Sequence, residues 1–347
     1  MVNYDEEYRR SGILKDAKDI YETTSGNMER LLGGSHPIVA RLRLTLAGIF
    51  KALGYLPQAE TLLVKMADMY EKTLGMGNQS TVTAQNNLAS IYIDQGQWKK
   101  AEQLQKKVLE NCKRTLGEEH RYTLVSMTNL GVTYWNQGRW KKVEELQVQE
   151  LEILKRLRGP EHRSTLTAMN NLASNYERQG RLEEAEKLKL QVLKTSSKVL
   201  GTDDYHTLAI MGNLANNYRL QKRWKETEDL EVQVVEARKR DYGTDHPLTL
   251  KSMGNLASTY AMQDRFDEAE KLESFVAETA VMQLGPEHPD TLTARNNLAH
   301  TLKGQGRDGE AIEMMAEVAR LRAKVLGPGH PETVRSTRNL DSWRTST

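Results

Sequence analysis

This chain of 347 residues has almost no cysteine, no long apolar run and no large excess of charge of either sign. Its single cysteine, Cys112, excludes an internal disulfide framework and fits a reducing compartment. No stretch approaches the roughly 18 apolar residues of a membrane span, and the first residues lack the apolar segment of a secretory signal. Lys and Arg number 49 against 47 Asp and Glu, so the charge gives no reason to expect a nucleic acid or a membrane as partner. We therefore expect a cytoplasmic protein.

Regular repetition is the strongest feature that is present. Eight glycines lie 42 residues apart, at Gly33, Gly75, Gly117, Gly159, Gly201, Gly243, Gly285 and Gly327. Asn-Leu pairs follow the same interval and begin at Asn87, Asn129, Asn171, Asn213, Asn255, Asn297 and Asn339. A fixed period without insertions means that each unit packs only on its neighbours. The sequence therefore predicts one array over residues 1–347.

Each unit is predicted to be a pair of helices. Ala84, Leu88 and Tyr92 fall on one arc of the first helix in the second full unit, as in an amphipathic helix. Gln95-Gly96 then separates the two helices, since glycine supplies the left-handed residue that ends a helix. The predicted full repeats are 33–74, 75–116, 117–158, 159–200, 201–242, 243–284 and 285–326.

The two ends depart from this pattern. Tyr8 and Gly12 align with Tyr92 and Gly96 after two periods, so we expect residues 1–32 to be a truncated first repeat. Such a repeat would begin midway through its first helix and turn at Gly12. Residues 327–347 predict a single capping helix, because a stack of repeats needs an end with a polar outer side.

The repeated residues resemble the tetratricopeptide pattern, with Leu88-Ala89-x-x-Tyr92 in the first helix and Ala101 in the second. Gly-x-x-His-Pro-x-Thr-Leu and Gln-Gly-x-x-x-x-Ala-Glu are more specifically similar to the kinesin-light-chain type of repeat. The resemblance covers about residues 13 to 340. It implies an all-α fold, a right-handed α-α superhelix of about eight 42-residue helical hairpins.

The resemblance also implies a non-catalytic scaffold that binds a protein or an extended peptide in its concave groove. Similar arrays form the sensor regions of fungal and bacterial nucleotide-oligomerisation-type (STAND) receptors, and we expect this chain to be such a ligand-sensing region of a larger receptor. A cargo adaptor of the kinesin-light-chain kind is the alternative. The chain has neither a phosphate-binding Gly-x-x-x-x-Gly-Lys-Ser/Thr loop nor a heptad segment.

The candidate binding residues lie on the groove side of the first helices. An asparagine row could hold the backbone of an extended peptide, because each amide both donates and accepts a hydrogen bond. The other interpretation is that each amide ties its own unit to the next. The row consists of Asn87, Asn129, Asn171, Asn213, Asn255 and Asn297.

Residues after the tyrosine of each unit vary, as expected either for a surface that selects a ligand or for exposed positions under little constraint. Arg178, Arg219, Lys251 and Lys303 would favour an acidic segment, and Trp135 is a candidate anchor. The sequence does not predict the oligomeric state.

Catalytic and cofactor chemistry is not favoured, and we expect neither an enzyme nor a cofactor nor a metal. Six histidines recur once per layer, too far apart to share one metal ion: His36, His120, His162, His246, His288 and His330. Acidic pairs such as Glu144-Glu145 predict a solvated helix face. An enzyme that uses the concavity as a small-molecule pocket remains a further alternative, and nucleic-acid binding ranks last.

Overall fold

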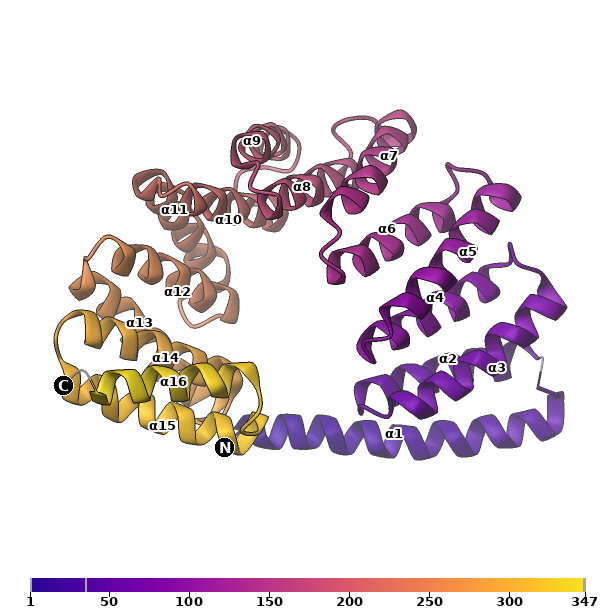
Figure 1. Ribbon diagram of the computed structural model, residues 1–347, viewed down its shortest axis with the longest axis horizontal. Helices are drawn as coiled ribbons and strands as arrows, with labels where there is room; N and C mark the ends of the chain where they lie inside the picture. The colour runs from indigo at the N-terminus through magenta and orange to yellow at the C-terminus, as the bar shows by residue number, and fades with distance from the viewer. Residues whose placement is uncertain (1, 35, 346–347) are drawn as a thin grey trace. The chain divides into compact units, whose positions relative to one another are not determined.

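The computed structural model describes residues 2–34 and 36–345, with side chains described from residue 14 onward. These residues form α-helices joined by short turns and contain no strand. Figure 1 shows the helices following one another as antiparallel pairs. Within the described ranges, no helix combines the length and the apolar character that a membrane span requires.

The chain divides into two compact units. The amino-terminal unit is Arg10–Leu188, and the carboxyl-terminal unit is Lys189–Thr347 together with Met1–Arg9. The division falls inside one helix, α9 (Leu182–Val199). A single array over residues 1–347 stays a prediction.

The amino-terminal unit contains three complete hairpins, in which each helix packs against the helices before and after it from α2 to α8. Its helices are α1 (Val2–Leu32, of which residues 10–32 belong here), α2 (Pro37–Ala52), α3 (Leu56–Leu74), α4 (Gln79–Asp94), α5 (Trp98–Leu116), α6 (Arg121–Asn136), α7 (Trp140–Arg158) and α8 (Arg163–Arg178).

The carboxyl-terminal unit repeats this arrangement from α10 to α16. Its complete helices are α10 (Tyr205–Leu220), α11 (Trp224–Tyr242), α12 (Pro247–Met262), α13 (Phe266–Leu284), α14 (Pro289–Gly304), α15 (Asp308–Leu326) and α16 (Pro331–Thr345). From here the even-numbered helices α2 to α16 are called first helices, and the odd-numbered helices α3 to α15 second helices.

The repeated histidines begin the first helices. In α6, for example, His120 Nδ1 accepts a hydrogen bond from the backbone N–H of Tyr122 at 3.2 Å. An N-terminal cap of this kind satisfies a backbone donor that has no partner inside the helix. The same cap is formed by His36, His162, His246, His288 and His330, and by Asn78 and Asp204 where the histidine is replaced. The histidine ladder is thus explained by helix capping.

Glycine ends most of the first helices as the sequence predicts. Gly96 has a φ of 71°, in the left-handed region that other residues enter at a cost. Two repeats place another residue at the equivalent position, Lys222 and Asp264, and both have a φ of 60°. These two turns therefore carry backbone strain that the glycine turns avoid.

The apolar core lies between successive helices. The leucine of each Asn-Leu pair is buried, at Leu88, Leu130, Leu172, Leu214, Leu256 and Leu298. In the layer of α6 and α7, Leu130 packs with Met127, Tyr134 and Val143. Because the same side chain fills the same hole in every layer, the repeats stack without changing register.

The expected turn at Gly12 is wrong. One continuous helix, α1, runs from Val2 to Leu32. The segment before Gly12 is mostly polar, so a separate short helix would have little apolar surface to bury. Continuing the helix satisfies the backbone hydrogen bonds without such packing.

Candidate functional site

The asparagine row lies on the accessible side of the first helices. Asn87, Asn171 and Asn255 are exposed, and the alternate members are half-buried. Among the described residues, the side chains of Asn87, Asn129, Asn171 and Asn255 make no hydrogen bond, whereas Asn297 Oδ1 lies 3.5 Å from Asn296 Nδ2. For these four asparagines, the structure therefore gives no support to the interpretation that the amide ties its unit to the next.

A pocket of about 340 Å³ opens beside this row in the amino-terminal unit and is called the α6–α8 pocket. It is formed by α6, α7 and α8, and its lining includes Val132, Trp135, Gln147, Glu150 and Asn171. Glu150 takes the position that valine occupies in most other repeats, and Thr128 Oγ1 donates to its Oε1 at 3.0 Å. Burial raises the pKa of the Glu150 carboxyl, and the Thr128 hydrogen bond only partly opposes that shift.

Trp135 is half-buried at the wall of this pocket. Its ring meets the ring of Trp140 edge-on, with 4.9 Å between centroids. The guanidinium of Arg178 lies 5.6 Å from the centroid of Trp135, close enough for a cation–π contact. The structure thus brings together Trp135, Asn171 and Arg178.

A second pocket, of about 490 Å³, lies in the carboxyl-terminal unit and is called the α12–α14 pocket. Lys251, Asn255 and Asn297 line it from the two first helices, and Glu273 lines it from α13. Burial raises the pKa of Glu273 to about 7, although a hydrogen bond with Thr301 opposes the shift. Oε2 of Glu273 is buried and has no hydrogen-bond partner.

The remaining candidates are not gathered in either pocket. Arg219 donates to Asn216 Oδ1 at 2.7 Å, and Lys303 forms an ion pair with Asp308 at 3.0 Å. The candidates outside both pockets and outside the Trp135 contact are Asn87, Asn129, Asn213, Arg219 and Lys303. The positive charge of Lys303 is thus partly neutralised within the chain.

Sequence reasoning missed a column of polar side chains on the second helices, all buried except Gln147, which is half-buried. Its members are Gln105, Gln147, Lys189, Glu231 and Glu273, with Leu63 and Met315 at the two ends. Thr133 Oγ1 donates to Gln105 Oε1 at 2.5 Å, and Thr259 Oγ1 donates to Glu231 Oε2 at 2.6 Å, each from the following first helix. The 42-residue spacing could have revealed this column, because polar residues recur on a face that is otherwise apolar.

Sequence reasoning also missed a bridge between successive repeats. Glu144, on α7, accepts hydrogen bonds from Gln179 and Arg181 of the next repeat at 2.9 and 2.8 Å. Arg181 also lies over the ring of Tyr176, 4.0 Å from its centroid. Equivalent trios are Glu102, Gln137 and Arg139; Glu228, Gln263 and Arg265; and Glu270, Gln305 and Arg307. The expectation that Glu144 belongs to a solvated face is wrong, whereas Glu145 is exposed.

Metal binding has no evident location in the part of the chain that the structure describes, where no group of three or more His, Cys, Asp and Glu side chains is placed to hold an ion. The ring nitrogen Nδ1 of each repeated histidine caps its own helix. What the geometry offers is two pockets beside a row of amides, which suits non-covalent recognition of a polypeptide.

Comparison with known families gives matches over most of the repeats. A family model described as tetratricopeptide repeat matches residues 80–156, 134–198, 164–240 and 206–273. A second model with the same description matches residues 291–332. No curated protein sequence matches the chain.

Solved structures with similar folds include repeats of a Podosopora anserina putative kinesin light chain, at 30% identity and a TM-score of 0.53 over 59% of this chain and 98% of that chain. BtubC (BKLC) from P. vanneervenii is similar at 20% identity, with a TM-score of 0.57 over 67% of this chain and 94% of that chain. A STAND protein with a tetratricopeptide repeat sensor from Pyrococcus horikoshii has 14% identity and a TM-score of 0.56, over 94% of this chain and 49% of that protein. These likenesses confirm the all-helical superhelix that the sequence predicts.

Proposed function

Because this chain belongs to the tetratricopeptide repeat family, we propose that it is a non-catalytic scaffold that binds an extended segment of another protein along its first helices. Tetratricopeptide arrays are suited to protein–protein interaction, since identical layers fill the core and leave one face free to differ. The observation that carries the proposal is the row of unpartnered amides at Asn87, Asn129, Asn171 and Asn255, with a pocket beside two of them.

The amides and the pockets would recognise different parts of the bound segment. Amide side chains that both donate and accept hydrogen bonds suit the backbone of an extended peptide, whatever its side chains. The α6–α8 and α12–α14 pockets would then select particular side chains. Arg178, for which no ion pair with another described residue is found, favours an acidic residue elsewhere in the segment.

The larger role that we propose is ligand sensing within a receptor. It is supported by the fold likeness to the STAND protein, whose tetratricopeptide repeats are described as a sensor and of which this chain spans about half. Cargo adaptation is the second candidate. It is favoured by the higher sequence identity, 30%, to repeats of a putative kinesin light chain. A cytoplasmic location, with neither nucleic acid nor membrane as partner, completes the proposal.

Selection of peptides by the full chain from a random display library tests the proposal. Binding of the selected peptides is measured by fluorescence polarisation for the unmodified chain and for Trp135→Ala, Asn171→Ala and Arg219→Glu. We expect Trp135→Ala to weaken binding at least tenfold, because a buried aromatic anchor contributes on the order of 2 kcal/mol. Trp98→Ala is the matched control, since Trp98 is exposed and lies outside both pockets.

Two results would count against this function. One is a failure to select any peptide. The other is a set of peptides whose affinities respond equally to Trp98→Ala and to the three groove variants. Turnover of a small molecule by the purified chain would instead favour the enzyme alternative.

A further inference from the structure

Two second helices of the carboxyl-terminal unit carry an arginine at the same repeat position, and this arginine is half-buried on α11 and buried on α15. Arg238 of α11 donates to the backbone oxygen of Leu248 at 3.0 Å and to Ser252 Oγ at 2.6 Å. Arg322 of α15 occupies the equivalent position two repeats later. It donates to Ser336 Oγ at 2.6 Å and to the backbone oxygen of Glu332 at 3.5 Å.

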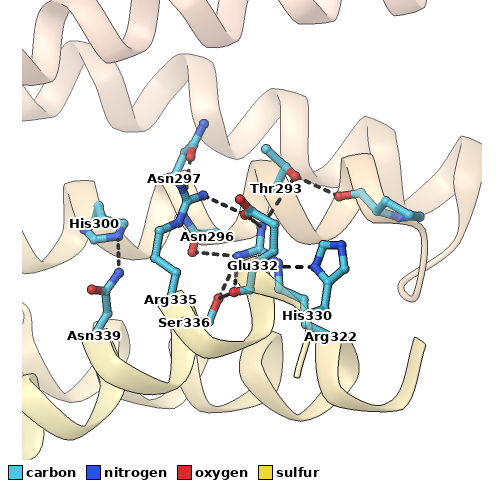
Figure 2. Close-up of polar contacts among 11 residues, drawn as sticks. Thr293, Asn296, Asn297, His300, Arg322, His330, Glu332, Arg335, Ser336 and Asn339 are labelled. Atoms are coloured by element: carbon cyan, nitrogen blue, oxygen red, sulfur yellow. Dashed lines mark hydrogen bonds and ion pairs between the residues drawn. The ribbon is translucent and has the colours of Figure 1, made fainter. Parts of the chain in front are cut away.

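Arg322 is buried and contacts polar groups on both neighbouring first helices. The residue is only 2% exposed, and its guanidinium also reaches Thr293 and Asn296 on α14 at 3.5 and 3.3 Å. The Glu332 carboxylate adds an ion pair at 3.3 Å. Figure 2 shows this group of side chains between α14 and α16. The space enclosed by one second helix and two first helices thus accommodates a guanidinium.

The layer between these two lacks the arginine. Its equivalent residue is Ala280, and Ser336 is replaced by Ala294. The positions of Thr293, Asn296 and Glu332 correspond to Lys251, Gly254 and Asp290. All five replacement residues, Ala280, Ala294, Lys251, Gly254 and Asp290, line the α12–α14 pocket. A Cβ added at Gly254 would meet nothing within 4 Å. The pocket is therefore the space that an arginine fills in the layers on either side.

The charge at the pocket favours a cation. Glu273 is only 3% exposed, and its Oε2 lacks a hydrogen-bond partner. Asp290 adds a second carboxylate and Lys251 one ammonium, so the ionised pocket has an excess of negative charge. A buried carboxylate without a cationic partner is costly, and a donor that enters the pocket would relieve that cost.

We propose that the α12–α14 pocket receives the guanidinium of an arginine side chain from the bound polypeptide segment, with Glu273 and the backbone oxygen of Asp290 as acceptors. The inference rests on the proposed function, because the asparagine amides of Asn255 and Asn297 line the same pocket and would hold the backbone of the segment. The bound side chain would then take the position that Arg238 and Arg322 occupy in the neighbouring layers.

The test uses short Gly-Ser peptides that differ only in a central arginine, citrulline or leucine. Citrulline keeps the shape of arginine without its charge. Binding to the full chain is followed by alanine-methyl NMR, with the methyl groups of Ala280 and Ala294 as reporters inside the pocket. We expect the arginine peptide to bind about tenfold more tightly than the citrulline peptide, as for a charge-assisted hydrogen bond with a buried acceptor.

Three variants make the result specific. Ala280→Arg supplies the missing guanidinium from the chain itself, so the preference for arginine over citrulline should disappear. Glu273→Gln should reduce that preference at least threefold, since it removes the charge and keeps the shape. Glu231→Gln is the matched control, because Glu231 is buried in the layer that Arg238 already fills, and it should leave the preference unchanged. If Ala280→Arg fails to fold, Gly254→Leu blocks the pocket from α12.

Equal binding of arginine and citrulline peptides would overturn the proposal, as would tighter binding of the leucine peptide or an arginine preference that survives in Ala280→Arg and Gly254→Leu. These failures are distinguishable from failure of the proposed function. The display selection reports on Trp135 and Asn171 in the amino-terminal unit, which the α12–α14 pocket does not include.

Discussion

Arg181 and Glu144 form an ion pair across the junction of two repeats, with 2.8 Å between Arg181 Nη1 and Glu144 Oε1. Arg181 precedes α9, whereas Glu144 lies on α7, one hairpin earlier. The same Arg side chain also pairs with Glu184 and covers the ring of Tyr176. The ion pair therefore connects the turn between the two helices of one repeat to the second helix of the preceding repeat.

A double-mutant cycle measures the coupling free energy between the two side chains. We expect Glu144→Gln and Arg181→Gln to show a coupling free energy of about 0.5–1 kcal/mol in urea unfolding, because the pair is partly exposed and shares its hydrogen bonds. Glu145→Gln provides the control, since Glu145 is exposed and should change the stability by less than about 0.5 kcal/mol. Strict additivity of the two single variants would show that the pair contributes nothing.

The two strained turns predict a gain in stability on substitution by glycine. Lys222→Gly should raise the free energy of unfolding by about 0.5–1 kcal/mol, since glycine adopts a φ near 60° without strain. Asp264→Gly should gain less, because Asp tolerates the left-handed region better than Lys does. Lys222→Ala keeps the strain and serves as the comparison. A gain from alanine as large as that from glycine would refute the backbone explanation.

Glu273 predicts a pH dependence of stability. Its pKa is about 7 in the folded chain, above the ordinary value of 4.5, so the folded state holds this proton more tightly than the unfolded state does. The contribution of Glu273 to stability therefore falls as the pH rises from about 4.5 to 7. Glu273→Gln removes this loss and should be more stable than the unmodified chain by about 1–3 kcal/mol at pH 8, with little difference at pH 5.

Glu144→Gln gives the opposite sign in the same measurement. Burial would raise the pKa of Glu144, but hydrogen bonds from Arg181 and Gln179 outweigh it and hold the pKa below its usual value. Its contribution is present above the unfolded pKa and is lost as the pH falls through the folded pKa. Chemical unfolding of both variants across pH 3 to 8 should therefore give divergent curves, and parallel curves would contradict both assignments.

The Arg322→Ala variant measures how much the buried arginine contributes to the free energy of unfolding. Alanine already occupies the equivalent position, Ala280, one repeat earlier. The variant should lose about 3 kcal/mol, since it leaves a cavity and removes hydrogen bonds to three buried or half-buried partners. Arg320→Ala is the control on the same helix, because Arg320 is exposed and forms a surface ion pair with Glu317 one turn earlier. We expect millimolar methylguanidinium to restore part of the lost stability of Arg322→Ala, as measured by thermal unfolding. No effect of the added cation would show that the space does not accept a free guanidinium.

The amino-acid pattern is sufficient to predict the helices, their order and the buried leucines. A period of 42 residues fixes which positions are equivalent, and an apolar stripe such as Ala84, Leu88 and Tyr92 fixes which face of a helix is buried. The turn predicted at Gly12 is wrong, because α1 continues through this position. A glycine motif favours a turn only where the two helices that it joins can pack together. The sequence also placed the asparagine row on the first helices, because equivalent positions in stacked units must share a face.

Which positions of different helices meet depends on how the hairpins stack. Glu144 and Arg181 lie 37 positions apart, and only the stacking of hairpins brings the carboxylate to the guanidinium. The α12–α14 pocket depends on residues from three helices at once, so no single helix pattern shows it. The period reveals that Ala280 stands where Arg238 and Arg322 stand in neighbouring repeats, but not that the arginine would be buried. Hydrophobic periodicity predicts burial along one helix, whereas a pocket or an ion pair depends on distances between helices.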